Sequence, residues 1–255
     1  MSHQIQRYGW IPDLPDQRDH IYASPIVAPT QLPPSVDLRP KCPPVYDQGQ
    51  LGSCTANGIG AAIQFEQMNQ QAATIFTPSR LFIYYNERVM ENTVASDSGA
   101  QIRDGIKSVA QQGACPETLW PYVIANFAVK PPANAYSTAL QSRVKLYQRL
   151  AQSLTLMKGC LASGYPFVFG FTVYESFESQ TVAQSGVVPM PGAGEQVLGG
   201  HCVVAVGYDD AQQRFIMRNS WGTGWGLQGY FTMPYAYLTQ AHPALASDFW
   251  TIRLV

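Results

Sequence analysis

The stretch RNSWGTGWGLQGYF, residues 218–231, says more about the fold than any other part of the chain. It joins two segments with the apolar character of strands, RFIM (214–217) and FTMPY (231–235). Asn219 could accept the N–H of a neighbouring imidazole and fix the orientation and tautomer of the ring, and Trp221 could cover such a pair. Taken by itself, however, the stretch is better interpreted as a Gly- and Trp-rich turn.

Two other residues could complete a site with Asn219. His201 opens the strand-like run HCVVAVGY (201–208) and, of the four histidines, it alone adjoins a predicted buried strand. Cys54 stands at the predicted start of a helix, after the turn-forming run DQGQLGS (47–53). The positive end of a helix dipole favours a thiolate there. Considered singly, each residue is more simply interpreted as structural.

The order and spacing of the three residues favour a common role. His201 follows Cys54 by 147 residues, and Asn219 follows it by 165. Papain-type nucleophiles stand about 130–150 residues before their His and Asn, so Asn219 lies slightly beyond that window. The order Cys, His, Asn suits nucleophilic catalysis by a thiolate–imidazolium pair.

Three motifs carry a resemblance to a known family. DQGQLGSC (47–54) resembles the oxyanion-loop and nucleophile motif of papain-like cysteine peptidases, GGHCVVAVGYDD (199–210) their histidine strand, and residues 218–231 their asparagine motif. The resemblance covers about residues 33–255, including LPPSVDLR (32–39) and SDSGAQIRDG (96–105). It implies peptide hydrolysis through an acyl-enzyme, with no metal or organic cofactor.

The resemblance also implies roles for individual residues. Cys54 is the expected nucleophile, His201 its base, and Asn219 the residue that holds the histidine. Gln48 matches the oxyanion-hole glutamine. Four further roles concern the substrate-binding residues. Ser98 and Gly99 would pair with the substrate backbone, and Ala100 and Gly170 would lie near the pocket for the second residue upstream of the cut. The Gly200 carbonyl would face the scissile residue, and Trp221 would shield the His–Asn bond.

Two departures from the family pattern leave the reacting groups untouched. Thr55 stands where tryptophan is usual, and Leu51 replaces a cysteine that often forms a disulfide near the active site. Because Ala100 and Gly170 are small, we expect a pocket for a bulky apolar or aromatic side chain. The paired-histidine insertion of carboxydipeptidase relatives is missing, which favours endopeptidase action.

The predicted fold class is α+β, with a papain-like helical lobe (about 45–125), an antiparallel sheet lobe (about 126–255) and the active-site cleft between them. Helices are expected over about 53–68, 77–90 and 102–113, the second capped by Thr77 and the third ending at Gly113. Residues 121–136 read as a loop, and strands are expected from about residue 164 onward.

Residues 1–32 form a predicted N-terminal arm ahead of the peptidase domain, residues 33–255. The arm is rich in proline and should be extended. It cannot be the long helical pro-segment usual in the family, although YGWIPDLPDQRD (8–19) resembles the short N-terminal stretch of bacterial members. We expect it either to pack across the cleft as a short pro-peptide or to strap the fold.

Composition narrows the remaining alternatives. The 255 residues are 46% hydrophobic and 13% charged, with a net charge of −1, so there is no electrostatic footprint for nucleic acid. Neither a membrane span nor a signal sequence is expected, and the sequence does not predict where in or outside the cell the protein is located. The expected partner is a peptide or protein substrate.

Three rival interpretations stay open. An acyl-transferase or amidase could use the same three residues. A catalytically silent protein could retain the fold for binding or regulation, although such a protein usually lacks at least one of the four reacting residues. A metal protein built on His201 and Cys202 lacks further ligands at suitable spacing.

Overall fold

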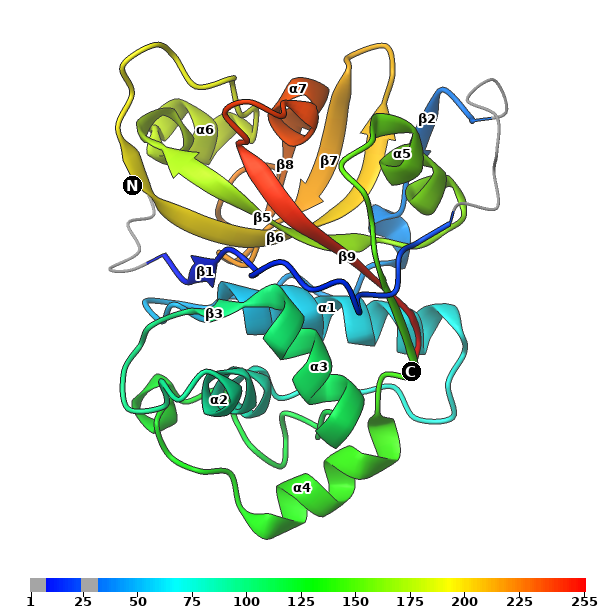
Figure 1. Ribbon diagram of the computed structural model, residues 1–255, viewed down its shortest axis with the longest axis vertical. Helices are drawn as coiled ribbons and strands as arrows, with labels where there is room; N and C mark the ends of the chain where they lie inside the picture. Colours follow the sequence, from blue (N-terminus) through cyan, green and yellow to red (C-terminus); the bar gives the residue numbers. More distant parts are fainter. Residues whose placement is uncertain (1–7, 24–31) are drawn as a thin grey trace.

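The computed structural model describes residues 8–23 and 32–255 of the chain. Figure 1 shows two lobes, one of helices and one built on an antiparallel sheet, with α1 (Cys54–Asn69) lying along the sheet lobe. The predicted α+β class and two-lobed architecture are confirmed. The predicted boundaries at residues 32, 125 and 126 stay predictions.

The remaining elements follow in chain order. The helices are α2 (Arg80–Met90), α3 (Ile102–Gln112), α4 (Ala133–Ala139), α5 (Leu154–Ala162), α6 (Gln180–Ser185) and α7 (Tyr235–Thr239). The strands are β1 (Trp10–Ile11), β2 (Ser35–Asp37), β3 (Ala100–Gln101), β4 (Leu146–Arg149), β5 (Phe167–Tyr174), β6 (Val197–Asp209), β7 (Arg214–Arg218), β8 (Tyr230–Pro234) and β9 (Ala246–Leu254).

Helix α1 is buried along almost its whole length because it packs against both lobes. Gly58 permits the close approach to the sheet: a β-carbon there would lie 3.2 Å from both Cys202 Sγ and Val168 Cγ1. An isolated helix with glycines at 58 and 60 would be weak, so tertiary packing stabilises α1.

Two predictions in the helical lobe need correction. Helix α2 begins at Arg80 rather than at Thr77, because Ser79 is the N-cap and its Oγ accepts the Phe82 N–H at 3.2 Å. The predicted loop over 121–136 is partly wrong, because α4 begins at Ala133 directly after Pro132. By contrast, α3 ends as predicted at Gly113, whose φ of 78° suits glycine.

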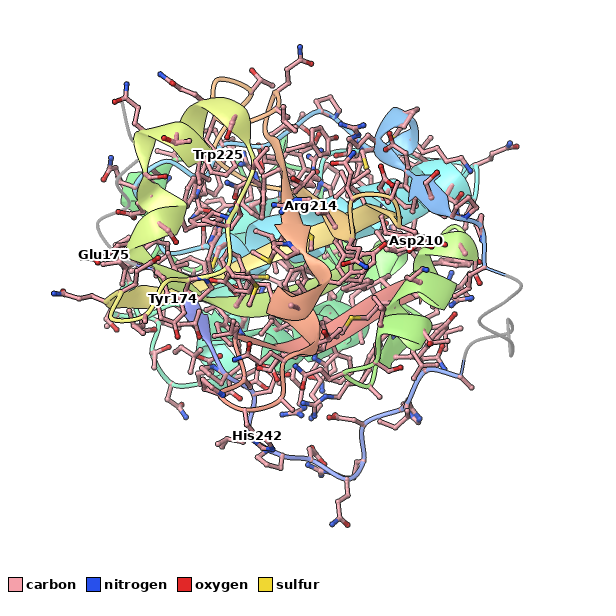
Figure 2. The ribbon with its side chains drawn as sticks, turned by 90° about the horizontal axis from the view of Figure 1, so that it is seen from above. Tyr174, Glu175, Asp210, Arg214, Trp225 and His242 are labelled. Atoms are coloured by element: carbon pink, nitrogen blue, oxygen red, sulfur yellow. The ribbon has the colours of Figure 1, made fainter. Side chains whose placement is uncertain are left out.

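The sheet lobe is one seven-stranded sheet in the order β4-β9-β5-β6-β7-β8, with β2 added to β6. All of its strand pairs are antiparallel. Figure 2 looks down on this lobe, with α1 beneath the strands. Aromatic side chains fill its interior, among them Phe167, Phe169 and Phe171 on β5. Strand β5, and β6 paired with it, are therefore supported by a packed aromatic core.

Part of the arm is bonded tightly to both lobes. We call residues 13–22 the strap. Asp13 accepts the Arg103 backbone N–H at 3.0 Å and the Trp250 indole N–H at 2.9 Å. Asp19 forms ion pairs with Arg103 at 2.6 Å and Arg149 at 3.0 Å. The arm predicted over 1–32 therefore rests on the protein where it is described; residues 1–7 and 24–31 lie outside the described residues.

No covalent bridge contributes to this fold. All five cysteines lie in the described part of the chain, and each is a free thiol. Among residues 8–23 and 32–255, no helix is both long and apolar enough to cross a membrane.

Candidate active site

Strand β6 carries His201 into the junction between the lobes. Its Nε2 lies 2.8 Å from Asn219 Oδ1, which follows β7 directly. The Ser220 backbone N–H donates to the same Asn219 atom at 2.9 Å, which identifies that atom as the amide oxygen. Because an oxygen only accepts, Nε2 of His201 carries the hydrogen and Nδ1 is the acceptor of the neutral ring. The structure therefore brings two of the predicted residues together.

Aromatic rings enclose this pair. The Trp221 ring stacks on the His201 ring with centroids 4.9 Å apart and an interplanar angle of 29°. Phe171 and Phe177 contact the imidazole from other sides, at centroid distances of 5.7 and 6.3 Å. His201 is fully buried, so water has little access to its bond with Asn219. Trp221 therefore lies against the imidazole of this pair.

Cys54 is the first residue of α1 and is also fully buried. Burial raises the pKa of its thiol to about 12, and the backbone groups of Cys202, Gly9 and Thr55 act in the opposite direction. A β-carbon on Gly58, one turn further along α1, would lie 3.2 Å from Cys202 Sγ, so the first turns of α1 lie against β6 beside the residue that follows His201. Gly9 lies against the Gly52 carbonyl, so the arm reaches the loop that leads into Cys54.

Gln48 links the loop before α1 to the asparagine motif. Its Oε1 accepts the Ser220 hydroxyl at 2.6 Å, and its Nε2 donates to the Leu51 carbonyl at 2.9 Å. Its backbone N–H donates to the Ser220 carbonyl at 2.9 Å. The side chain is thereby fixed, and an amide nitrogen retains a second hydrogen to donate.

Residues 8–11 of the arm fill the junction between the lobes; we call this segment the plug. Strand β1 runs parallel to β3 there, with Trp10 opposite Ala100 (Figure 1). The Gly9 carbonyl accepts the Ala100 N–H at 2.8 Å. A β-carbon on Gly9 would overlap the Gly52 carbonyl, so only glycine fits at this point.

The side chains of the plug occupy both flanks of the site. The Trp10 indole lies against Gly170 and Gly200, where β-carbons would meet its ring. The Tyr8 ring packs edge-on against His201 with centroids 6.0 Å apart, and its hydroxyl donates to Glu178. The plug therefore contacts both the histidine and the cysteine side of the site.

The predicted substrate-binding residues are largely the residues that the plug touches. Gly99, Ala100, Gly170 and Gly200 all contact it, whereas the Ser98 hydroxyl donates to the neighbouring Gly99 carbonyl at 3.1 Å. The sequence did not identify Tyr8, Gly9 and Trp10 as the occupants. The one feature of the sequence that sets these three residues apart is their order, aromatic–glycine–aromatic, in an arm that is otherwise rich in proline.

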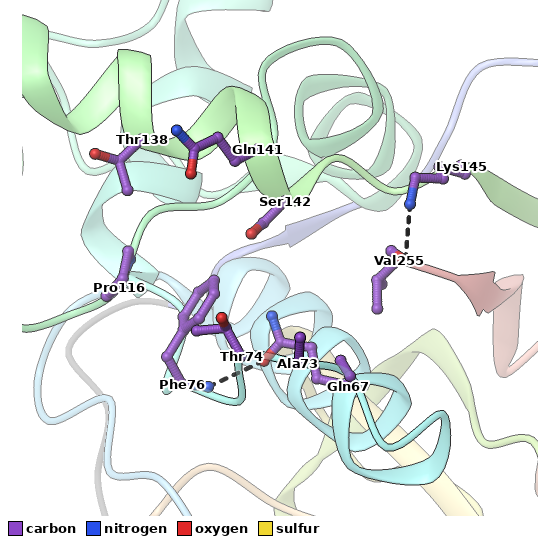
Figure 3. Close-up of a pocket in the computed structure, with 11 residues that line it drawn as sticks. Gln67, Ala73, Thr74, Phe76, Pro116, Thr138, Gln141, Ser142, Lys145 and Val255 are labelled. Carbon is purple, nitrogen blue, oxygen red and sulfur yellow. Dashed lines mark hydrogen bonds between the residues drawn. The ribbon is translucent and has the colours of Figure 1, made fainter.

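A separate hollow of about 400 Å³ lies at the far end of α1 (Figure 3). It is bordered by Gln67, which accepts the Phe76 N–H at 3.2 Å, and by Lys145, which bonds the Val255 carbonyl at 3.2 Å. None of the predicted site residues lines it. In the junction itself, the side chains and backbone of the plug lie against Gly52, Gly99, Gly170 and Gly200.

The fold is the two-lobed fold of the papain-like cysteine peptidases, and the buried thiol and the imidazole–amide pair lie where its lobes meet. The model of the papain family cysteine proteases matches residues 32–242. The chain therefore belongs to the papain family.

Several relatives agree with this assignment. The crystal structure of xylellain, a cysteine protease from Xylella fastidiosa, is similar with a TM-score of 0.92 and 46% identity over 97% of this chain and 96% of that one. An uncharacterised peptidase C1-like protein of Acanthamoeba polyphaga mimivirus is 43% identical, over 98% of this chain and 88% of its own length. The cathepsin B-like CP3 of Giardia intestinalis is 31% identical, over 80% and 70%. These relatives support a cysteine peptidase.

Proposed function

We propose that Cys54 and His201 form the reacting pair of a cysteine endopeptidase, and that the plug blocks it in the state described here. One observation carries the proposal: a peptide backbone already lies between the loop that leads into Cys54 and the predicted substrate-binding segment. Gly9 lies against the Gly52 carbonyl, two residues before Cys54, and its own carbonyl accepts the Ala100 N–H at 2.8 Å. A substrate backbone would take the same place once the plug leaves.

The chemistry follows from the groups around the thiol. The Cys54 thiolate attacks a peptide carbonyl, and the oxyanion that forms is stabilised by the Gln48 amide and the Cys54 backbone N–H. His201, protonated and held by Asn219, gives its proton to the leaving amine. Water activated by His201 then hydrolyses the acyl-enzyme. Removing one oxyanion donor typically lowers such rates about 10²–10³-fold.

The covered state keeps the thiol unreactive in two ways. The plug excludes the substrate, and burial of Cys54 in this state raises the pKa of its thiol to about 12, so the protonated form dominates. When the plug leaves, water returns to the sulfur and that pKa falls. Departure of the plug would therefore both admit the substrate and make the Cys54 thiol easier to ionise.

The pocket beside Trp10 supports a preference for aromatic side chains. Gly170 and Gly200 provide the space that an indole occupies, and Ala100 pairs with the same residue. We propose that a substrate places a bulky apolar or aromatic side chain there, at the second residue upstream of the cut. Hydrolysis is favoured over acyl transfer because the similar proteins carry the names of proteases.

The test compares the whole chain with a single substitution in the plug. Gly9→Ala places a methyl group on the Gly52 carbonyl and should expel the plug while leaving the strap in place. Gly224→Ala is the matched control, because a β-carbon there meets nothing within 4 Å. An epoxide-based papain-type inhibitor should label Cys54 much faster in Gly9→Ala than in the parent or the control, with matching gains in turnover of a fluorogenic dipeptidyl substrate.

The outcomes separate the parts of the proposal. No labelling of Cys54 in any variant would overturn the peptidase chemistry. Equal labelling in the parent and in Gly9→Ala would leave the chemistry and remove the blocking role. Cys54→Ala, which should neither label nor turn over, guards against a contaminating protease.

A further inference from the structure

Two loops contact the backbone of the plug at Gly9. The Gly52 carbonyl, in the loop before Cys54, lies so close to Gly9 that a β-carbon would not fit. Gly99, in the predicted substrate-binding segment, also approaches Gly9 closely, and Ala100 bonds it. A substrate backbone that replaces the plug would meet the same two loops, so their relative position decides where its carbonyl lies relative to the thiol.

A single carboxylate joins these two loops. The Gly52 N–H donates to both oxygens of Asp97, at 3.1 and 3.0 Å. The buried Tyr84 on α2 donates its hydroxyl to the same carboxylate and accepts the Gly99 N–H at 3.2 Å. The nucleophile loop is thereby connected to the substrate-binding segment by four hydrogen bonds through two side chains.

No covalent connection duplicates this link. Leu51, next to Gly52, stands where the family resemblance implies a cysteine that often forms a disulfide, and all five cysteines of the chain are free thiols. Hydrogen bonds to an ionised acceptor are shorter and stronger than neutral ones, so a carboxylate suits the task.

We propose that Asp97, supported by Tyr84, is a positioning residue that fixes the distance between the nucleophile loop and the segment Ser98–Ala100. It touches neither the thiol nor the imidazole in any bond described here. Its effect reaches the reaction through the placement of the substrate backbone. The proposal rests on the proposed peptidase function.

The expected size of the effect follows from the sensitivity of nucleophilic attack to geometry. A misplacement of about 1 Å can lower a rate about 10²-fold. Loss of the Asp97 link should therefore lower kcat/KM for peptides by about 10- to 10²-fold. Alkylation of Cys54 by iodoacetamide should change by no more than about threefold, because this reagent is too small to need the Ser98–Ala100 segment and forms no oxyanion.

The experiment uses the whole chain carrying Gly9→Ala, so that the plug does not mask the site. Asp97→Ala, Asp97→Asn and Tyr84→Phe are each added to this background. The amide of Asn keeps one acceptor for the Gly52 N–H, so Asp97→Asn should retain more activity than Asp97→Ala. The matched control is Asp209→Ala, which also removes a carboxylate bonded to backbone N–H groups (Ala211 at 2.8 Å, Gln212 at 3.4 Å) but stands at the last residue of β6.

The ratio of the two rates decides the result. A fall in peptide kcat/KM with unchanged iodoacetamide alkylation, strongest in Asp97→Ala and absent in Asp209→Ala, supports the positioning role. Unchanged peptide turnover, or an equal fall in both rates, overturns it. Should Asp97→Ala fail to fold, Asp97→Asn and Tyr84→Phe give the same comparison. If the Gly9→Ala background neither turns over nor alkylates at Cys54, the peptidase proposal fails first and this one with it.

Discussion

The indole of Trp10 occupies the space that any side chain at position 170 would need: a β-carbon built on Gly170 would overlap the five-membered ring. The two residues are 160 positions apart in the chain and belong to the arm and to β5. The absence of a side chain at Gly170 therefore leaves space beside β5 for a large ring.

Filling this pocket should change which peptides are cut. Gly170→Val, placed in the Gly9→Ala chain, should lower kcat/KM about 10-fold or more for dipeptidyl substrates with Phe at the second position upstream of the cut, and much less for those with Ala there. A panel of fluorogenic substrates measures the ratio. A uniform loss across the panel would contradict the pocket assignment.

Removing the amide that holds the imidazole should lower the rate without unfolding the protein. Asn219→Ala deletes the acceptor 2.8 Å from His201 Nε2. Hydrogen bonds to charged groups contribute about 1.5–3 kcal/mol, so kcat/KM should fall about 10- to 10²-fold. Asn86→Ala is the control, since Asn86 is an equally buried amide bonded to the Phe82 carbonyl at 2.8 Å. It should lower the melting temperature and leave kcat/KM unchanged; similar kinetics in the two variants would argue against the role of Asn219.

Docking of the arm should weaken as the pH rises toward neutrality. Asp248 accepts the Asp13 N–H at 2.8 Å. Burial, and then the charge of Asp13, raise the pKa of Asp248 to about 6, and burial also raises the pKa of Asp13. A carboxyl whose pKa is raised in the docked state favours docking most below its free pKa of about 3.9, and this contribution is lost as the pH rises through about 6.

The measurement is the rate of Cys54 alkylation in the parent chain between pH 4 and 8, divided by the rate in Gly9→Ala to remove the titration of the thiol itself. The ratio should rise near pH 6. Asp248→Asn should flatten this rise while keeping one oxygen for the Asp13 N–H. A rise of the same size in that variant would exclude Asp248 as its source.

A buried carboxyl beneath the nucleophile should be neutral at ordinary pH. Glu87 is fully buried, and its Oε1 accepts the Thr55 hydroxyl at 2.6 Å. Burial raises its pKa well above the usual value. Such a group stabilises the fold while it is protonated, and this stability is lost as the pH rises through the raised pKa.

Glu87→Gln should therefore preserve the fold at neutral pH and reduce the loss of stability under alkaline conditions. Thr55→Val, which leaves Oε1 of Glu87 without its donor, should destabilise the protein by about 1–3 kcal/mol. Urea unfolding of the three proteins at neutral and alkaline pH checks both statements. A Glu87→Gln protein that is much less stable than the parent at neutral pH would mean that the carboxyl is ionised.

The sequence was sufficient for the class of fold and for the site motifs because these depend on local signals. Cys54 at a helix start follows from the turn residues before it, and α3 stops at Gly113 because glycine allows the positive φ there. The strand of His201 follows from an apolar run, but the prediction that His201 opens it is wrong, because β6 begins four residues earlier, at Val197. By contrast, the sequence of α4, ANAYSTA, favours a loop because the run is short and has no apolar stripe; only Ala135 and Ala139 are buried.

Local sequence signals do not predict which residues of the arm fill the junction between the lobes. An extended arm can be predicted from its prolines, but where it lies depends on contacts with residues 90 or more positions away, such as those of Trp10 with Ala100 and Gly170. The link from Asp97 to Gly52 is equally non-local, 45 residues apart. Pairings of this kind depend on the assembled tertiary structure and leave no local periodicity to detect.

Only Pro12 separates the plug from the strap, whose first residue, Asp13, is bonded to both lobes. When the plug leaves the site, it consequently remains tethered next to it at an effective concentration in the millimolar range (roughly 1 mM or above). Dilution of the protein would not relieve the block. A free peptide with the sequence of the plug, added to the Gly9→Ala protein, would have to reach similarly high concentrations to reproduce what the tether achieves in every single molecule.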